Sequence, residues 1–161
     1  MQNPPPPRDI NFILDECLPH VISVALNNVG FPITSCREQE KSEWLDDQLI
    51  PWIGEQNWVW ITKDDAARRG HRALIQKARI SVIWIRGIER RDGTTTRNNI
   101  LAKDVLHLLV AKLDDIKESV SNARGPRFFL LFMNAKAPTL KVYTTLDDIE
   151  NQLANPRRNR K

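Results

Sequence analysis

Four runs of consecutive apolar and aromatic residues alternate with segments of helical periodicity, and this alternation constrains the fold more than any other feature. The runs lie within residues 11–16, 58–62, 81–87 and 127–133. Continuous apolar strands of this kind are buried on both faces, as in a parallel sheet that helices cover on each side. The sequence therefore predicts an α/β fold of three layers, α/β/α, with a central, mostly parallel sheet.

The segments between these strands predict the remaining elements. Helices are expected at 19–30, 44–56, 64–79, 95–121 and 146–153, and weaker strands at 31–36 and 140–145. Asp46 or Asp47 is expected to cap the second helix, which places Pro51 in its first turn. Because there is no internal repeat and no dividing linker, residues 10–153 are predicted to form one domain. A flexible proline-rich arm, 1–9, precedes it and a basic tail, 154–161, follows it.

Composition excludes several classes of protein. No stretch approaches the roughly 20 apolar residues of a membrane helix, and the N-terminus lacks the apolar core of a signal peptide. The two cysteines, Cys17 and Cys36, form no CxxC motif, which argues against a disulfide framework and against a thiolate metal site. We expect both to be small buried thiols, and we expect a cytoplasmic protein without a membrane partner.

Carboxylates follow two of the predicted strands and open the helix between them. They are Asp15 and Glu16 after the first strand, Asp46 and Asp47 at the helix start, and Asp64 and Asp65 after the third strand. Because parallel strands end at one edge of a sheet, up to six carboxylates would crowd that edge and repel each other. A divalent cation removes this conflict, and ligands that are all oxygen select Mg²⁺ or Mn²⁺ over zinc.

Asp15 and Asp64 are the strongest candidate metal ligands, since both follow strands that are predicted to be fully buried. Metal ions held by carboxylates and water are the usual equipment of phosphodiester hydrolysis. Thr62, two residues before Asp64, is a candidate for orienting a water molecule or a ligand. High β-propensity explains Thr62 equally well.

The other acids each have a structural alternative. Asp65 is as well suited to capping the next helix as to binding a metal. One of Asp46 and Asp47 is expected to serve as a cap, and Glu16 is equally consistent with a solvated side chain.

Three short motifs occur in a characteristic order. Residues 14–18 read Leu-Asp-Glu-x-Leu at the end of a strand, and Asp46 opens a helix that continues to Leu49 and Ile50. Thr62 and Asp64 then form Thr-x-Asp after a hydrophobic strand. Over residues 10–86 this pattern resembles the PIN-like nucleases, in particular the VapC-like toxins of toxin–antitoxin pairs.

The resemblance implies a PIN-like domain that acts as a Mg²⁺- or Mn²⁺-dependent endoribonuclease. Its catalytic residues would be Asp15, Asp46, Asp64 and Thr62, with Glu16 and Asp65 as further metal ligands. Many relatives read Thr-x-Asp-x-Asp-Phe, whereas here the second acid, Asp65, comes one place early. The resemblance also implies an RNA substrate and a small cognate antitoxin as partner, and it leaves a homodimer open.

Basic residues are a second feature of the chain, whose net charge is +4. Arg86 ends the fourth predicted strand, and Arg90, Arg91 and Arg97 follow it. Basic segments of this kind are compatible with a polyanionic partner. We expect Arg86, Arg90 and Arg91 to contact RNA, with a salt bridge as the alternative for Arg86 and a solvated loop or an antitoxin-facing surface as the alternative for the others.

A phospho-receiver module is the rival interpretation. Asp15 and Glu16 would bind Mg²⁺, Asp64 would accept the phosphoryl group, and Lys136 would follow the fifth strand. Against it, Arg86 and Gly87 end the fourth strand where a receiver needs Ser or Thr, and the helix-opening acids would have no role.

Aromatic residues and histidines are expected to be mainly structural. Trp58, Trp60 and Trp84 lie in predicted strands and are expected in the core. Trp44 and Trp52 flank the acidic helix start and are better placed to contact RNA. The histidines, His20, His71 and His107, lack metal-binding spacing.

Overall fold

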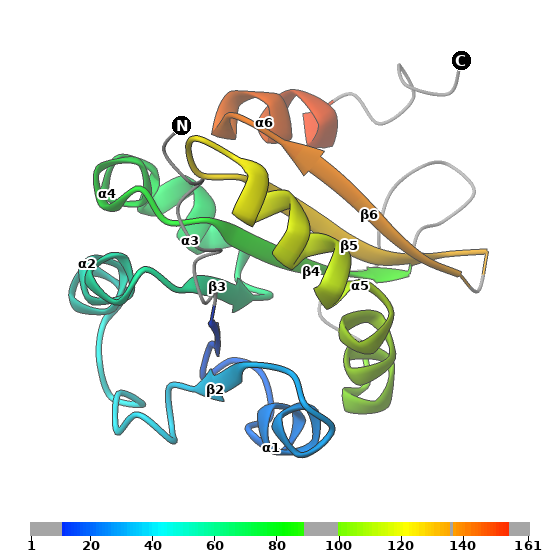
Figure 1. The fold of residues 1–161 in the computed structure, drawn as a ribbon. Coiled ribbons are helices and arrows are strands. Elements are labelled where there is room, and N and C mark those ends of the chain that lie inside the picture. The colour runs from blue at the N-terminus through cyan, green and yellow to red at the C-terminus, as the bar shows by residue number, and fades with distance from the viewer. Residues whose placement is uncertain (1–10, 89–99, 136, 155–161) are drawn as a thin grey trace, which may run out of the picture.

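The computed structural model describes residues 11–88, 100–135 and 137–154. Within these residues the chain forms one six-stranded sheet with the order β2-β1-β3-β4-β5-β6 (Figure 1). The strands are β1 (Phe12–Leu14), β2 (Ile33–Ser35), β3 (Val59–Thr62), β4 (Val82–Ile88), β5 (Phe128–Asn134) and β6 (Ala137–Tyr143). The first five are parallel and β6 runs antiparallel to β5, which confirms the mostly parallel sheet.

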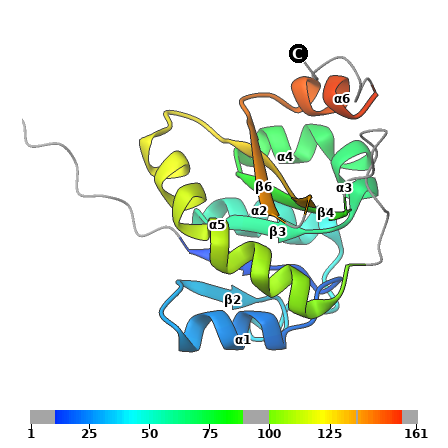
Figure 2. The same cartoon turned by 90° about the vertical axis from the view of Figure 1, so that its right-hand side faces the viewer.

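Helices cover both faces of this sheet (Figures 1 and 2). One face carries α1 (Val21–Asn28) and α5 (Ala102–Asn122), which pack on Phe12, Leu14, Ile61 and other residues of a first core cluster. The opposite face carries α2 (Asp46–Gln56), α3 (Asp65–Gly70), α4 (Arg72–Ala78) and α6 (Leu146–Ala154), which enclose a second cluster. The three-layer α/β/α prediction is therefore confirmed.

The strands are apolar on both faces because each face meets a helical layer. In β1, Phe12 and Leu14 belong to the first cluster and Ile13 to the second, and all three are fully buried. Trp60 and Trp84 are also fully buried, as expected, whereas Trp58 lies just before β3 and is only partly buried.

Several boundaries differ from those predicted. The helix expected at 64–79 is divided into α3 and α4 at His71, whose backbone leaves the helical conformation directly after Gly70. The first helix starts at Val21 instead of residue 19, and β6 starts at Ala137 instead of residue 140. The long helix is described from Ala102, while residues 95–99 of its predicted range lie outside the described residues.

The start of α2 corrects the prediction that Asp46 or Asp47 caps it. The N-cap residue is Leu45, which has no polar side-chain atom to accept a helix N–H, and its own N–H donates to Gln48 Oε1 over 3.3 Å. Asp46 and Asp47 occupy the first turn, where negative charge complements the helix dipole. Pro51 is the sixth helical residue and so lies in the second turn, not the first.

The predicted arm, residues 1–9, and most of the basic tail lie outside the described residues; Ala154, counted with the tail, instead ends α6. No helix in the described part of the chain is long and apolar enough to span a membrane.

Candidate functional site

The strand order brings the first and third strands together, as is required if their carboxylates are to crowd one edge of the sheet. β1 pairs with β2 on one side and β3 on the other, so the order reverses at β1, and such switch points form the binding crevices of open α/β sheets. Asp15 follows β1 and its N–H donates to the carbonyl of Ile61 in β3 over 2.8 Å. Asp64 follows β3 by two residues, so the two acids share one edge.

Thr62 joins these two acids. Its side chain is fully buried, and its hydroxyl donates to Asp15 Oδ2 over 2.7 Å. The hydroxyl oxygen of Thr62 also accepts the backbone N–H of Asp64 over 3.1 Å. The hydroxyl therefore orients the Asp15 carboxylate directly.

Cys17 is a second group that holds Asp15. Its thiol lies 3.2 Å from Asp15 Oδ2 and 3.4 Å from Thr62 Oγ1, and it accepts the N–H of Lys63 over 3.5 Å. Burial, followed by the negative charge of Asp15, raises the pKa of the Cys17 thiol to about 12. The protonated thiol thus acts as a hydrogen-bond donor to the carboxylate. Cys36 is buried as predicted, whereas Cys17 is only half-buried.

Asp64 is fixed by the start of α3. Its Oδ1 accepts the N–H groups of Ala66 and Ala67 over 2.8 and 3.3 Å, so Asp64 is the N-cap of this helix. The sequence suggested Asp65 for that role, and the structure assigns it to the preceding residue. Oδ2 of Asp64 accepts no hydrogen bond from any residue that the structure describes.

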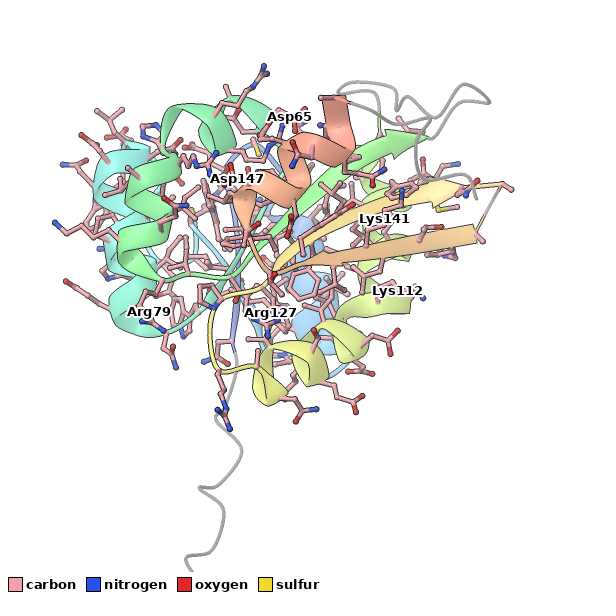
Figure 3. The ribbon with its side chains drawn as sticks, turned by 90° about the horizontal axis from the view of Figure 1, so that it is seen from above. Asp65, Arg79, Lys112, Arg127, Lys141 and Asp147 are labelled. Carbon is pink, nitrogen blue, oxygen red and sulfur yellow. The ribbon has the colours of Figure 1, made fainter. Side chains whose placement is uncertain are left out.

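Asp65 is held in a different network. One carboxylate oxygen binds Arg68 over 2.8 Å and the other binds Arg86. Burial opposes ionisation of Asp65, but the guanidinium groups of Arg86 and Arg68 outweigh it and lower the pKa of the carboxyl. Arg68, only 4% exposed, also binds Glu150 of α6 over 2.6 Å. Asp65 therefore anchors α3 to the sheet and to α6, and in Figure 3 it lies beside α6, away from Arg79 and Arg127.

Asp46 faces the same edge from the start of α2. Burial, and next the charge of Asp15, raise the pKa of the Asp46 carboxyl; the charges of Asp64 and Asp47 add to this, and His71 opposes it. The Oδ2 atom of Asp46 lies 3.6 Å from His71 Nε2. Asp15, Asp46 and Asp64 are thus electrostatically coupled.

Two further acids are less involved. Glu16 is exposed and its backbone N–H donates to Asp15 Oδ1 over 2.8 Å. Asp47 is exposed on α2 and, as described above, does not cap it.

The donor chemistry of this edge suits a hard divalent cation, since the coupled groups are carboxylates. Among the described residues, no three His, Cys, Asp or Glu side chains are already arranged as a metal-binding group. Mg²⁺ is commonly held by one or two carboxylates and several waters, so a closed cage of side chains is not required. The residues therefore fit a water-rich Mg²⁺ or Mn²⁺ site.

The predicted RNA-contacting arginines have different positions. Arg86 is 13% exposed and pairs with Asp65, which supports the salt-bridge alternative. Arg90 and Arg91 lie outside the described residues, and so does Lys136, which the receiver interpretation needs.

Two contacts of the site were missed by the sequence analysis. The spacing of Cys17 two residues after Asp15 carries a weak signal, because a side chain so close in sequence can turn back to the carboxylate. His71 carries none, since it reaches Asp46 only through the packing of α4 against α2.

One comparison with known proteins gave a match, largely in the first half of the chain. Residues 10–87 match the model of a family described as a PIN like domain, and the matched segment contains Asp15, Asp46 and Asp64. PIN-like domains are commonly nucleases, so the match supports a hydrolase of nucleic acids. Searches of curated proteins and of solved structures gave no match. The assignment to VapC-like toxins stays a prediction.

Proposed function

We propose that this protein is a metal-dependent endoribonuclease, and the observation that carries the proposal is the arrangement of three coupled carboxylates at one edge of a PIN-like fold. Asp15 and Asp64 end neighbouring parallel strands and are joined through Thr62. Asp46 opens α2 toward them, and burial, followed by the charges of Asp15 and Asp64, raises the pKa of its carboxyl. An edge with this concentration of negative charge is suited to binding a cation, which can in turn bind the phosphodiester of the substrate.

In this proposal Asp15, Asp46 and Asp64 hold Mg²⁺ or Mn²⁺, and Glu16 is a further, exposed candidate. A bound ion of this kind would lower the pKa of its water and neutralise charge on the phosphate. Asp65 is left out, because both of its oxygens are bound to arginines.

The rest of the site positions these carboxylates. Thr62 and Cys17 direct hydrogen bonds at Oδ2 of Asp15, which fixes the rotamer of that side chain. The first N–H groups of α3 hold Oδ1 of Asp64 and leave Oδ2 for a ligand. In a preorganised site of this kind, less free energy is lost in ordering the side chains when the substrate binds.

We further propose, from the resemblance of residues 10–86 to VapC-like toxins, that the nuclease is a cytoplasmic toxin silenced by a small antitoxin. Arg90 and Arg91 are proposed to contact RNA. A small open reading frame beside the gene, whose product co-purifies with this chain and suppresses cleavage, would support the toxin assignment.

The receiver interpretation is weaker at the same edge. The strand order of β1 to β5 also occurs in flavodoxin-like proteins, so topology alone does not separate the two. Asp64, the required phosphoacceptor, is an N-cap with one oxygen engaged by α3, and strand β4 presents Arg86 in an ion pair with Asp65.

Single substitutions test the proposal. Asp15→Asn, Asp46→Asn and Asp64→Asn should each lower the cleavage rate of single-stranded RNA in Mg²⁺ by at least about 100-fold, because each removes a charge from the metal site. Asp47→Asn, an exposed neighbour on α2, is the matched control and should cleave normally. Equal activity in all four variants would refute the proposed site.

A further inference from the structure

A cavity of about 250 Å³ adjoins the proposed metal site. It lies where β1 and β2 end, on the β2 side of Asp15. The segment that leads into α1 and the loop before α2 complete its wall. Its polar lining residues are Asp15, Glu16, His20, Ser35, Arg37 and Ser42. Since Asp15 belongs to both the cavity and the site, a ligand in the cavity would lie next to the reacting phosphate.

Arg37 gives the cavity a cation. Its Nη1 lies 3.4 Å from His20 Nδ1, and its side chain is exposed. Within the described part of the chain, Arg37 forms no ion pair with a carboxylate. A guanidinium whose N–H donors are not engaged by a carboxylate, beside the imidazole of His20, is suited to binding a phosphate.

The remaining lining suits a nucleoside. Glu16 is exposed and offers a carboxylate that can accept from a ribose hydroxyl or a base amino group. Ser42 adds a hydroxyl from the loop before α2, and the buried side chains of Leu14 and Leu18 supply apolar surface. The volume is below the roughly 300–1,000 Å³ of drug-sized sites, which suits one nucleotide unit and no more.

The wall that carries Arg37 and Ser42 is held in place. The N–H of Cys36 donates to Leu14 in β1 over 2.9 Å, and the N–H of Lys41 returns to the Cys36 carbonyl over 2.7 Å. The ammonium of Lys41 then lies 3.9 Å from the ring centre of Trp44 and 5.2 Å from that of Trp52. The cavity is therefore preformed, and these two tryptophans brace its loop.

We propose that this cavity binds one nucleotide unit of the nucleic-acid substrate beside the cleaved bond, with Arg37 contacting its phosphate. The inference rests on the proposed nuclease function for the meaning of "substrate", but its physical content is a binding site. It can therefore be measured without catalysis.

The test measures binding in the Asp64→Asn background, in which we expect cleavage to be at least about 100-fold slower and the cap of α3 to be kept. A fluorescein-labelled single-stranded RNA oligonucleotide is titrated in Mg²⁺ at several salt concentrations, followed by anisotropy. Arg37→Ala should raise Kd roughly tenfold, because a charge-assisted hydrogen bond to phosphate is lost. It should also flatten the salt dependence by about 0.7 in logarithmic slope.

Arg124→Ala is the matched control. Arg124 is an exposed arginine before β5, at the opposite edge of the sheet, and it forms no hydrogen bond or ion pair with a described residue. Its replacement should leave both quantities unchanged, and Arg37→Lys should fall between wild type and Arg37→Ala. Thermal unfolding of each variant verifies that the fold is kept.

The outcomes separate the cavity from the nuclease proposal. If wild-type protein does not cleave RNA but Arg37→Ala weakens oligonucleotide binding, the nuclease proposal fails and the cavity stands. If Arg37→Ala binds like Arg124→Ala, or if the parent binds no oligonucleotide, the cavity proposal is overturned. Inorganic phosphate that binds as tightly as a nucleoside 5′-monophosphate would also overturn it, since the cavity would then be only an anion site.

Discussion

Replacing Asp64 should separate its two roles, the N-cap of α3 and the proposed metal ligand. Asp64→Ala removes the acceptor for the N–H groups of Ala66 and Ala67, and losing such a cap costs about 1 kcal/mol. Asp64→Asn retains an Oδ1 acceptor, and asparagine caps helices as well as aspartate does. It also relieves repulsion with Asp46, which offsets the lost interaction with the helix dipole.

Thermal unfolding in EDTA, followed by circular dichroism, measures the first role. For a chain of this size, about 1 kcal/mol corresponds to a fall in Tm of roughly 2–4 °C, which we expect for Asp64→Ala. Asp64→Asn should remain within about 1 °C of wild type. Added Mg²⁺ should raise the Tm of wild type but of neither variant, because a ligand stabilises only the state that binds it. If Asp64→Asn lowers the Tm as much as Asp64→Ala, Asp64 does not act as an N-cap. If Mg²⁺ raises the Tm of all three proteins equally, Asp64 is not a metal ligand.

Three other measurements follow from the structure. A Cβ on Gly54 would lie 2.8 Å from the carbonyl oxygen of Ala78, so Gly54→Ala should cost about 1–3 kcal/mol in urea unfolding despite the better helix propensity of alanine. Gly125→Ala is the control, because a Cβ there would have no atom of the described residues within 4 Å. Equal stability of the two variants would contradict the close packing of α2 on α4. Because Arg86 and Arg68 outweigh burial and lower the pKa of Asp65, its ionised carboxylate stabilises the fold above the unfolded pKa of about 3.9, and this stabilisation is lost as pH falls through the lower folded pKa. The stability deficit of Asp65→Asn should therefore exceed about 1 kcal/mol at pH 7 and shrink below about pH 4. A deficit that does not change with pH would refute this prediction. Acetyl phosphate with Mg²⁺ should add no phosphoryl group to Asp64 by intact mass, and an adduct would favour the receiver interpretation.

The neighbourhood of the acids could be predicted because it depends on local patterns and one rule of topology. Apolar runs identified β1 and β3, and the shared edge of parallel strands placed Asp15 near Asp64. Nothing beyond the order of residues and the pairing of two strands was needed for this part of the site.

The roles of individual acids depend on contacts that sequence patterns do not show. Asp64 and Asp65 are adjacent, and either can cap a helix. The choice is made by Arg68 and Arg86, which bind Asp65, and Arg68 is itself held by Glu150, 82 positions along the chain. Such long-range ion pairs follow from tertiary packing, so they could not be deduced from the motif.

The central claim, hydrolysis at a carboxylate-bound metal, is tested most directly by metal dependence. Purified protein is freed of metal with EDTA, and cleavage of a single-stranded RNA is followed as Mg²⁺ or Mn²⁺ is added back, with Asp15→Asn as the inactive reference. We predict no cleavage in EDTA, recovery with either ion, and no recovery in the variant at equal metal concentration. Undiminished cleavage by wild type in EDTA, or cleavage by Asp15→Asn at the wild-type rate, would contradict the account.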